Sequence, residues 1–376
     1  MPSTFQVWME GKPADSGFYD RLLSLEVEEN ADMPGAIQIR LPVSRMADGD
    51  LSGVNEAGLQ PLKGIAVTVT PEGGDEAVIF DGHVLGHKLH LESGVRESTL
   101  EVYGQDASWL MNLEEKTREW ADVTDGLTAN AIFSEYGFTP APENTDDDSG
   151  TYSEDAHTLM QRGTDLEFLR TLARRGGRLF RVAGGPVPGA PVGVFAKPDT
   201  ESDSVATLTL NDPDAPNVRK LEFEWDVMRP SAVRGQQTTF TDSSGTPATG
   251  NTNDSGLSAL DRRDLATFAG KPMTVILTAP ADDADQLTRR ARALLRESEW
   301  FVRCTGEADL SVIDVVFRAG AVVIVEGVGS VHSGKYLVWS VRHVIDQQMH
   351  KMAFVLVRNA VGPEPSAAGG SPGGPL

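Results

Sequence analysis

Two distant stretches of the chain carry the same pattern and decide the fold class: Gly64-Ile65-Ala66-Val67-Thr68-Val69 and Gly320-Ala321-Val322-Val323-Ile324-Val325. The first continues through Phe80-Asp81-Gly82 to Leu100-Glu101-Val102-Tyr103, and the second through His332-Ser333-Gly334 to Phe354-Val355-Leu356-Val357. Each reads as a glycine, an apolar strand, a turn, a second glycine, a long strand, a loop and a third strand. The chain is therefore predicted to contain one β unit twice. A ring or tube requires such a layout, whereas catalysis does not.

Alternation and turn signals extend the β prediction over the first ~110 residues. Ile37 and Ile39 alternate with Gln38 and Arg40, and polar turns follow at Pro34-Gly35, Gly49-Asp50, Glu72-Gly73-Gly74-Asp75 and Ser93-Gly94. Regular short strands of this kind predict an antiparallel sheet that curls into a sandwich or barrel.

Three helices interrupt the β pattern. Thr124 and Asp125 precede a helix that stops at Gly137, and a capping box of Thr164 and Glu167 opens a second helix that ends at Gly176-Gly177. A third helix opens at Pro280 and Asp282, and its apolar residues keep helical spacing at Leu287, Ala291, Leu294 and Leu295.

Polar segments separate these elements. The loop from Pro140 to Gly150 contains Asp146 to Asp148, and because the three aspartates are contiguous we expect a solvated loop and not a calcium site. The segment from Thr241 to Ser258 is predicted to be a mobile loop. The predicted fold is β-rich α+β, with two β-barrels around a small inserted α/β domain. We assign residues 1–110 to the first barrel, 111–217 to the inserted domain, 218–360 to the second barrel with one outer helix, and 361–376 to a disordered tail.

Composition excludes several classes of protein. The chain has 376 residues and a net charge of −22, with 55 acidic and 33 basic residues, which argues against nucleic acid as a partner. The single cysteine, Cys304, excludes an intrachain disulfide and a multi-cysteine zinc site, and we expect it to be a buried thiol. Apolar runs are strand-sized, so no membrane span is predicted. The N-terminal residues lack a signal-peptide pattern, so we predict no secretory leader and a cytoplasmic location before any assembly.

Candidate site residues give no active-site pattern. His83 and His87 would share a strand face about 13 Å apart, with His90 on the other face, so they predict no metal site. His343 is expected to be packed or hydrogen-bonded within a strand, and Asp81 to lie at a junction of turn and strand. The remaining candidates are basic and lie in and after the second helix, where they form either an anion site or a solvated set: Arg170, Arg174, Arg175 and Arg178.

Known catalytic motifs are missing from the sequence. It contains no G-x-S-x-G, H-E-x-x-H or P-loop pattern, and the glycines at Gly184, Gly185 and Gly189 read as a turn between strands. We therefore predict no enzymatic activity, no catalytic, cofactor-binding or metal-binding residue, and no cofactor. An alternative stays open, a surface hydrolase or a glycan-binding β module that uses acidic side chains and exposed tryptophans such as Trp109, Trp120 and Trp225.

Three segments resemble the phage late control protein D family. The C-terminal one runs from Arg318 to Gly329 and continues through Ser333-Gly334-Lys335-Tyr336 and Val341-Arg342-His343 to Arg358-Asn359. The middle one, from Gln161 to Arg174, is similar to the family's Q-x-x-x-T-D-x-x-F-L-x-x-L-A helix, and Phe80-Asp81-Gly82-His83-Val84 resembles its F-x-G-x-V strand. The order and spacing of these segments cover residues of about 60 to 360.

The resemblance implies a structural hub in the baseplate of a contractile tail or injection system. In that family two tube-like barrels in one polypeptide let a homotrimer form a pseudo-sixfold ring. The implied partners are the inner tube or a tube initiator, the spike, and baseplate wedge proteins. The third helix would pack outside the second barrel. Because nothing folded is expected after residue ~360, the spike would be a separate polypeptide and this chain would have no lytic activity.

Overall fold

The computed structural model describes residues 4–93, 98–153, 158–211, 216–237, 248–278, 284–346 and 348–362. The N-terminal part contains β1 (Thr4–Met9), β2 (Lys12–Pro13), α1 (Ser16–Arg21), β3 (Ser24–Asn30), β4 (Ala36–Pro42), η1 (Ala57–Leu59), β5 (Gly64–Thr70), β6 (Ala77–His90), β7 (Thr99–Asp106) and η2 (Ala107–Asn112). The middle part contains β8 (Glu115–Trp120), α2 (Asp125–Glu135), β9 (Thr139–Pro140), η3 (Pro142–Thr145), β10 (Leu159–Thr164), α3 (Asp165–Gly176), β11 (Leu179–Ala183) and β12 (Val192–Ala196).

The C-terminal part is again dominated by strands. It contains β13 (Ala206–Thr209), β14 (Val218–Trp225), β15 (Ala232–Arg234), β16 (Gln236–Gln237), β17 (Ala248–Thr249), β18 (Arg263–Asp264), α4 (Leu265–Ala269), β19 (Thr274–Ile276), α5 (Ala284–Ser298), β20 (Val302–Asp309), α6 (Leu310–Ile313), β21 (Val322–Glu326), β22 (Gly334–Ile345), β23 (His350–Arg358) and β24 (Ala360–Val361).

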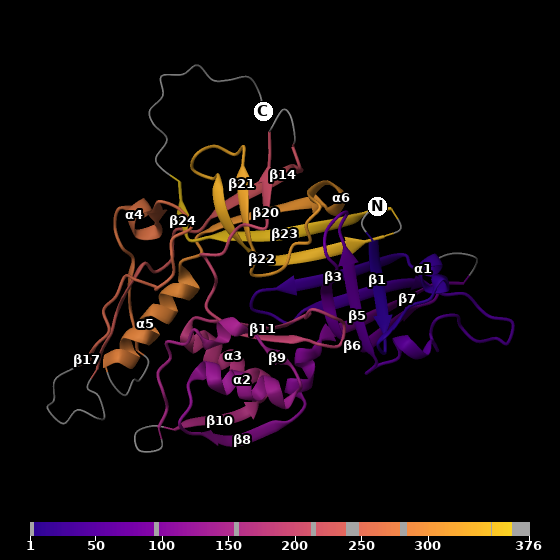
Figure 1. Cartoon of the computed structure of the whole chain (residues 1–376), viewed down its shortest axis with the longest axis horizontal. Coiled ribbons are helices and arrows are strands. Elements are labelled where there is room, and N and C mark those ends of the chain that lie inside the picture. Colours follow the sequence, from indigo (N-terminus) through magenta and orange to yellow (C-terminus); the bar gives the residue numbers. More distant parts are fainter. Residues whose placement is uncertain are drawn as a thin grey trace.

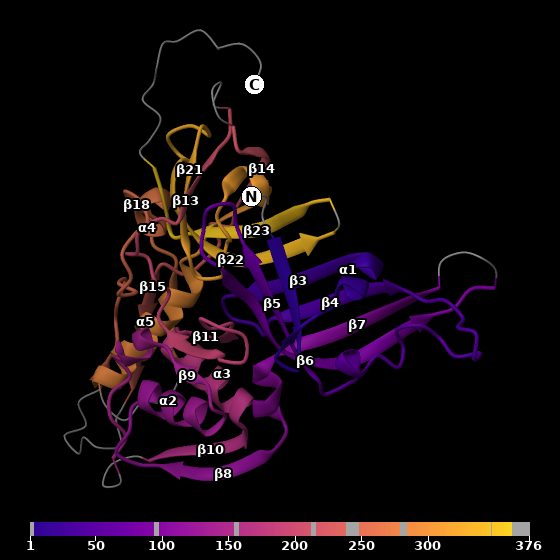
Figure 2. The same cartoon turned by 45° about the vertical axis from the view of Figure 1, so that its right-hand side comes forward.

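One large sheet joins the two ends of the chain. Its path is β14-β20-β23-β22-β3-β4-β7-β6-β5-β1-β2, and β21 pairs with both β22 and β13. The contact between the N-terminal and C-terminal strands is the antiparallel pair of β3 and β22, in the middle of this path (Figures 1 and 2). The predicted fold class is confirmed, since the chain is β-rich α+β with two tube-like barrels and a small α/β part between them.

The apolar cores follow the same division. One continuous cluster runs through both barrels, from Val7 to Val361, and includes Val27 and Val341 on either side of the β3–β22 junction. The middle part has a core of its own, built on α2 and α3 and centred on the buried Phe133, Leu169 and Phe195. The two barrels therefore fold as neighbours on a shared core, while the inserted part packs separately.

The predicted duplication is present, with a corrected register. β5-β6-β7 and β21-β22-β23 are both antiparallel meanders, and the long middle strand of each has a bulge, after Val84 in β6 and after Val338 in β22. Aligning the bulges pairs Gly320 with Leu62 instead of Gly64, and both residues have a left-handed φ, 86° and 71°. The alignment of Gly320 with Gly64 is therefore shifted by two residues. A shift of two residues keeps every side chain on the same face of its strand.

A second repeated segment escaped the sequence comparison. When the two meanders are aligned on their bulges, β4 beside β7 corresponds to β20 beside β23. In the same alignment, β3 beside β4 corresponds to β14 beside β20. The residues then match as Leu25-Glu26-Val27-Glu28-Glu29-Asn30 and Leu221-Glu222-Phe223-Glu224-Trp225-Asp226. The duplicated unit therefore comprises at least five strands and not three.

The first two predicted helices are confirmed together with their caps. Thr124 caps α2, and α3 has both halves of the capping box before it ends at Gly177, whose φ of 60° is left-handed. α5 is described from Ala284, so its predicted start lies outside the described residues. It packs on α3 and on β15, where Ala291 and Leu295 contact Val233.

Two loop predictions need correction. Residues 241–247 lie outside the described residues, but 248–258 are ordered, because Thr252 exchanges backbone hydrogen bonds with Val233 and Ser255 is buried. The loop from Pro140 to Gly150 is only partly solvated, since it forms η3 and buries Asn144. Of the predicted tail, Val361 belongs to β24, and 363–376 lie outside the described residues.

Candidate functional site

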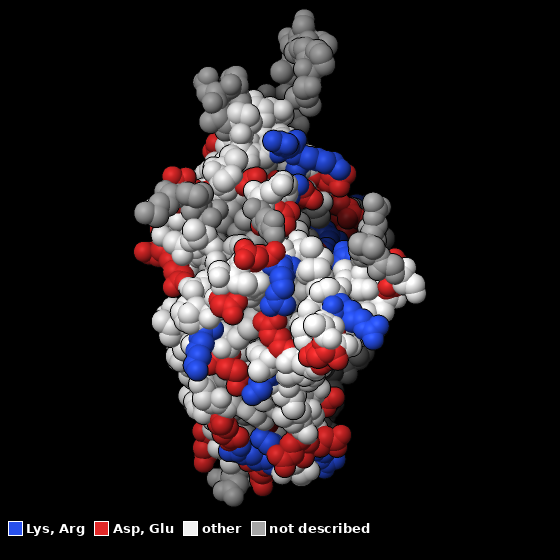
Figure 3. All heavy atoms as spheres, turned by 90° about the vertical axis from the view of Figure 1, so that its right-hand side faces the viewer, with Lys and Arg blue, Asp and Glu red and all other residues white. Residues whose placement is uncertain are grey.

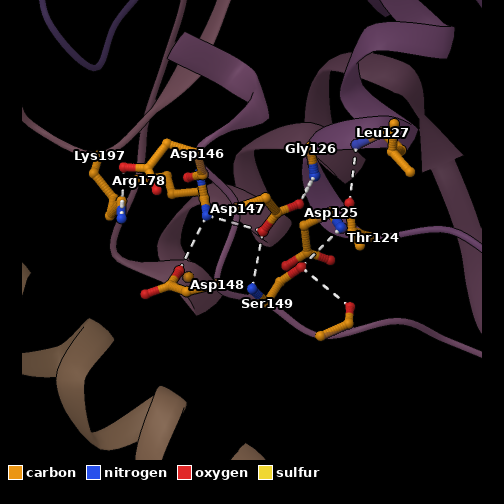
Figure 4. Close-up of polar contacts among 12 residues, drawn as sticks. Thr124, Asp125, Gly126, Leu127, Asp146, Asp147, Asp148, Ser149, Arg178 and Lys197 are labelled. Carbon is orange, nitrogen blue, oxygen red and sulfur yellow. Dashed lines mark hydrogen bonds and ion pairs between the residues drawn. The ribbon is translucent and has the colours of Figure 1, made fainter.

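The densest polar cluster lies where the end of α3 meets the loop before β10 (Figure 4). Gly177 turns the chain out of α3 and directs Arg178 inward, where it is 3% exposed. Its guanidinium donates to Asp147 Oδ1 at 2.9 Å, to Asp148 Oδ1 at 3.0 Å and to the carbonyl oxygen of Asp146 at 3.0 Å. Both terminal nitrogens of Arg178 are therefore engaged by one acidic loop, while its buried Nε has no hydrogen-bond partner.

Neighbouring acids complete the cluster. Asp147 also accepts from the backbone N–H of Gly126 at 2.5 Å, at the start of α2, where the helix dipole favours an anion. Asp125 pairs with Arg175 at 2.7 Å and accepts from the hydroxyl of Tyr152 at 3.0 Å. Both sequence interpretations of the arginines, an anion site or a solvated set, are wrong for Arg175 and Arg178, because internal aspartates neutralise them.

Arg296 extends this cluster to α5. It is 3% exposed and donates to Asp148 Oδ2 at 2.5 Å, to the carbonyl of Gly176 at 3.1 Å and to the carbonyl of Ser255 at 2.7 Å. Burial acts to raise the pKa of Asp148, but the hydrogen bond and charge of Arg296 outweigh it and lower that pKa to about 2. Such a set of ion pairs stabilises the junction of two parts of the chain. Next to it, Ser255 donates to Glu299 at 2.8 Å, and burial raises the pKa of Glu299 to about 7.

The three clustered histidines do not converge. The bulge after Val84 places one extra residue between His83 and His87, so the prediction that they share a face is wrong. His83 packs edge-on against Trp109 at 5.3 Å between ring centroids, His87 contacts the carbonyl oxygen of Leu59, and His90 pairs with Glu92 at 3.1 Å. Among the described residues, no group of three His, Cys, Asp or Glu side chains could hold a metal ion.

A different histidine pair is buried in the second barrel. His343 on β22 and His350 on β23 lie 3.0 Å apart, Nδ1 to Nε2, as the prediction of a packed or hydrogen-bonded His343 requires. Burial lowers the pKa of His350 to about 4 and, together with the charge of its neighbour, holds the pKa of His343 well below its ordinary value. Sequence reasoning missed His350, because only the hairpin register brings the two rings together.

Asp81 joins the inserted part to the first barrel. It lies inside β6 and not at a junction of turn and strand, which corrects the prediction. Its carboxylate accepts the backbone N–H of Gly189 at 2.7 Å, in the hairpin between β11 and β12. Burial raises the pKa of Asp81 against the opposing effect of these backbone donors. The next residue, Gly82, has no room for a side chain, since a Cβ would lie 2.1 Å from the carbonyl oxygen of Gln105.

The three candidate tryptophans sit in separate places. Trp109 belongs to η2 beside His83, and Trp120 is buried with its Nε1 bonded to Gln161 at 3.1 Å. Trp225 on β14 packs on Phe268. The three side chains therefore pack against different partners at three separate places.

A shallow groove of about 910 Å³ runs over the face of β14, β20, β23 and β22. Its lining mixes charges of both signs and includes Arg219, Lys220, Glu222, Arg342 and Lys351. The face of the molecule in Figure 3 likewise intersperses basic and acidic side chains. A mixed surface of this kind does not provide the clustered positive charge that phosphate backbones require. Cys304, predicted to be buried, is buried next to this groove on β20.

Solved structures of tail and type VI secretion proteins have a fold similar to that of this chain. The family model described as "Alg8 N-terminal domain" matches residues 2–347. The chain has the fold of the tail protein from Neisseria meningitidis (15% identity, TM-score 0.63, covering 96% of this chain and 97% of that one). It is also similar to the prophage MuSo2 43 kDa tail protein from Shewanella oneidensis (14%, TM-score 0.60, 96% and 99%).

A third similar structure comes from E. coli, a component of the type VI secretion system described as structurally similar to T4 bacteriophage tail proteins (16%, TM-score 0.55, covering 92% of this chain and 76% of that one). A search of curated protein sequences finds no match to this chain. No helix in the described ranges is both long and apolar enough to cross a membrane.

Proposed function

The chain belongs to the family described as the Alg8 N-terminal domain, and from this premise we propose that it is a hub subunit in the baseplate of a contractile tail or injection system. The tail and type VI secretion proteins that share its fold support a structural role in such a particle. The resemblance to late control protein D adds the finer assignment of a hub that joins the inner tube to the central spike.

The observation that carries this proposal is the pair of equivalent barrels. Their meanders share strand order, direction and the position of the bulge. Three chains with two barrels each present 3 × 2 = 6 quasi-equivalent units. A homotrimer built in this way has threefold symmetry toward a spike and approximate sixfold symmetry toward a tube.

We also propose a domain division, binding partners and a location for the chain. Residues 1–110, 111–217 and 218–360 act as first barrel, inserted domain and second barrel, with β13 pairing to β21 across the second boundary. The inner tube or its initiator, a separate spike protein and the wedge proteins are the proposed partners. The chain assembles in the bacterial cytoplasm and acts as part of the particle, without enzymatic activity of its own.

Native mass spectrometry of the purified 40.4 kDa chain tests the proposal, with the chain alone and mixed with candidate tube and spike proteins. We expect a trimer, either of the free chain or in the presence of a partner. A chain that stays monomeric in every mixture contradicts the hub. If it also bound oligosaccharides, the glycan-binding module would replace it.

A further inference from the structure

The junction of β3 with β22 shows how one barrel of this chain attaches to the other. The two strands pair antiparallel from Leu25↔Ile345 to Asn30↔Ser340, directly beyond the bulge of β22. The backbone N–H of Ala31 donates to the carbonyl oxygen of Trp339 at 2.8 Å and extends the ladder by one residue. This junction lies within one chain, and the duplication provides a second copy of each of its two strands.

The second copies are β14 and the outer half of β6. β14 corresponds to β3, and the segment Gly86 to Leu91 corresponds to Ser340 to Ile345 of β22. In the part of the chain that the structure describes, β14 ends the path of the large sheet and pairs only with β20. β5 pairs with β6 only as far as His83, so the corresponding edge of β6 also has no strand partner among the described residues.

We propose that β14 of one copy pairs with the outer edge of β6 in the next copy, in the register of the β3–β22 junction. This inference rests on the proposed hub and specifies its interface between copies. The register places Leu221 opposite Leu91, Phe223 opposite Leu89 and Trp225 opposite His87. Glu224 then lies opposite Lys88. A head-to-tail contact of this kind covers both of these strand edges in every copy when the ring closes.

Exposed apolar side chains on the two edges support the pairing. At the internal junction Leu25, Val27, His343 and Ile345 are all at most 1% exposed. Their counterparts at the open edges are only partly covered, since Leu89 is 39% and Leu91 55% exposed, and Leu221 and Phe223 are half-buried. The same positions are thus fully buried where a partner strand is present and partly exposed where it is not.

Charge is repeated as well. At the internal junction the Arg342 guanidinium binds Glu26, with Nε 2.9 Å from Oε2. The counterparts are Lys88 and Glu222, again one cation and one acid. In the single chain they lie on opposite ends of the sheet path and pair with local residues, Lys88 with Glu101 at 3.3 Å and Glu222 with Lys220 at 2.9 Å. Both remain largely exposed and free to pair across two copies.

Backbone N–H groups on both edges point outward, toward the position of a partner strand. The N–H of Asp226 donates to Phe301 at 2.8 Å, so alternate residues of β14 face β20, and the N–H groups of Leu221, Phe223 and Trp225 face outward. On the other edge, the N–H of Val43 donates to Ser98 at 2.8 Å. Hydrogen-bonded and non-hydrogen-bonded pairs alternate along an antiparallel ladder. In the register that this bond sets, His87 and Leu89 of β6 form non-hydrogen-bonded pairs with β7, so their N–H groups point away from β7. Both edges therefore present donors and acceptors at the spacing of an antiparallel ladder.

A cysteine pair in one chain tests the register. Lys88→Cys with Glu224→Cys places two exposed thiols in a non-hydrogen-bonded pair, where Cα atoms lie about 4.5 Å apart and a disulfide can form. We expect mild oxidation of the assembled protein to give covalent trimers on a non-reducing gel. Glu28→Cys with Arg342→Cys, the same position at the internal junction, is the positive control and should close within one chain. Cys304 is fully buried and does not compete.

Lys88→Cys with Glu222→Cys is the matched register control, because diagonal partners lie about 7–8 Å apart and link poorly. The protein could be a trimer by mass and yet form the disulfide more readily with Glu222→Cys, or with neither cysteine pair. That result overturns the proposed strand pairing and leaves the hub proposal intact. A chain that never associates, alone or with tube and spike, contradicts the hub itself. The two failures are therefore distinguishable.

Leu89→Pro tests the edge independently of cysteine chemistry. Proline removes the outward N–H at a position where an edge strand tolerates it, while Leu89→Ala keeps that N–H and removes only the side chain. We expect Leu89→Pro to abolish the trimer at concentrations at which Leu89→Ala still assembles, with unchanged thermal unfolding of the single chain. A trimer of Leu89→Pro that is as stable as the unmodified one overturns the proposal.

Discussion

Single residues in this chain show that buried charge is either neutralised by a partner or kept neutral. Arg178 and Arg296 meet aspartates within 3.0 Å, whereas His343 and His350 avoid charge altogether. Their lowered pKa values mean that both rings are neutral in the folded protein at neutral pH, and one hydrogen bond joins His343 Nδ1 to His350 Nε2. The pair therefore links the stability of the second barrel to pH.

The histidine pair predicts acid sensitivity. The unfolded chain binds protons at His350 with an ordinary pKa near 6.5, and the folded chain only near 4, so stability is present above about 6.5 and is lost as the pH falls toward 4. Between pH 7 and pH 5 we expect a loss of about 2 kcal/mol from this residue. Urea unfolding at a series of pH values measures it.

His350→Gln is the informative variant, since it keeps a hydrogen-bonding side chain beside His343 and cannot take up a proton. It should flatten the pH dependence of the unfolding free energy. His90→Gln, on the exposed end of β6, is the control and should leave the slope of the unmodified protein in place. An unchanged slope in His350→Gln would contradict the assignment.

Among the elements, α3 shows how local chemistry fixes a boundary. The Thr164 hydroxyl accepts the N–H of Glu167 at 3.2 Å, and the Glu167 carboxylate accepts the N–H of Thr164 at 3.4 Å. The same hydroxyl donates to Asn112 at 2.9 Å and so attaches the start of the helix to η2. The cap therefore orients the helix as well as starting it.

Removal of the cap should weaken the inserted part. Thr164→Ala loses the bonds to Glu167 and Asn112, and we expect a decrease in the unfolding free energy of about 1–2 kcal/mol. Thr164→Ser retains the hydroxyl and should stay within about 0.5 kcal/mol of the unmodified protein. Denaturant unfolding followed by far-UV circular dichroism compares the two, and equal losses in both variants would show that the hydroxyl does not act as a cap.

The whole molecule is held together by contacts between parts that are distant in sequence. Besides the β3–β22 ladder, Arg296 connects α5 with the end of α3, the loop at Asp148 and the segment at Ser255. This one side chain joins the second barrel to the inserted part.

Arg296→Ala should loosen that connection. It removes the donor to Asp148 Oδ2 and to two carbonyl groups, while Arg178 still donates to Asp148 Oδ1. We expect a loss of about 2 kcal/mol, below the range for fully buried pairs because Asp148 is partly solvated and keeps Arg178. Hydrogen exchange should rise at the end of α3 and in the Asp148 loop. Arg292→Ala, four residues earlier on α5, loses only an exposed pair with Asp254 at 3.2 Å and should cost less than about 1 kcal/mol. Equal exchange in the two variants would show that Arg296 does not join the parts.

The sequence by itself determined what depends on neighbours along the chain. Alternating apolar residues gave the meanders on either side of Gly64 and Gly320, and side-chain caps gave the boundaries of α2 and α3. Both signals arise within a few residues, because strand faces repeat every two residues and caps act within one helical turn.

Only the tertiary structure decided the rest. The β3–β22 junction, the pairing of His343 with His350 and the acids that neutralise Arg178 all join residues whose meeting depends on hairpin register or packing of separate elements. The bulges after Val84 and Val338 move every later residue of β6 and of β22 to the other face of the sheet, and no local sequence pattern reveals them. Register is a property of two strands at once, so a single strand's sequence cannot determine it.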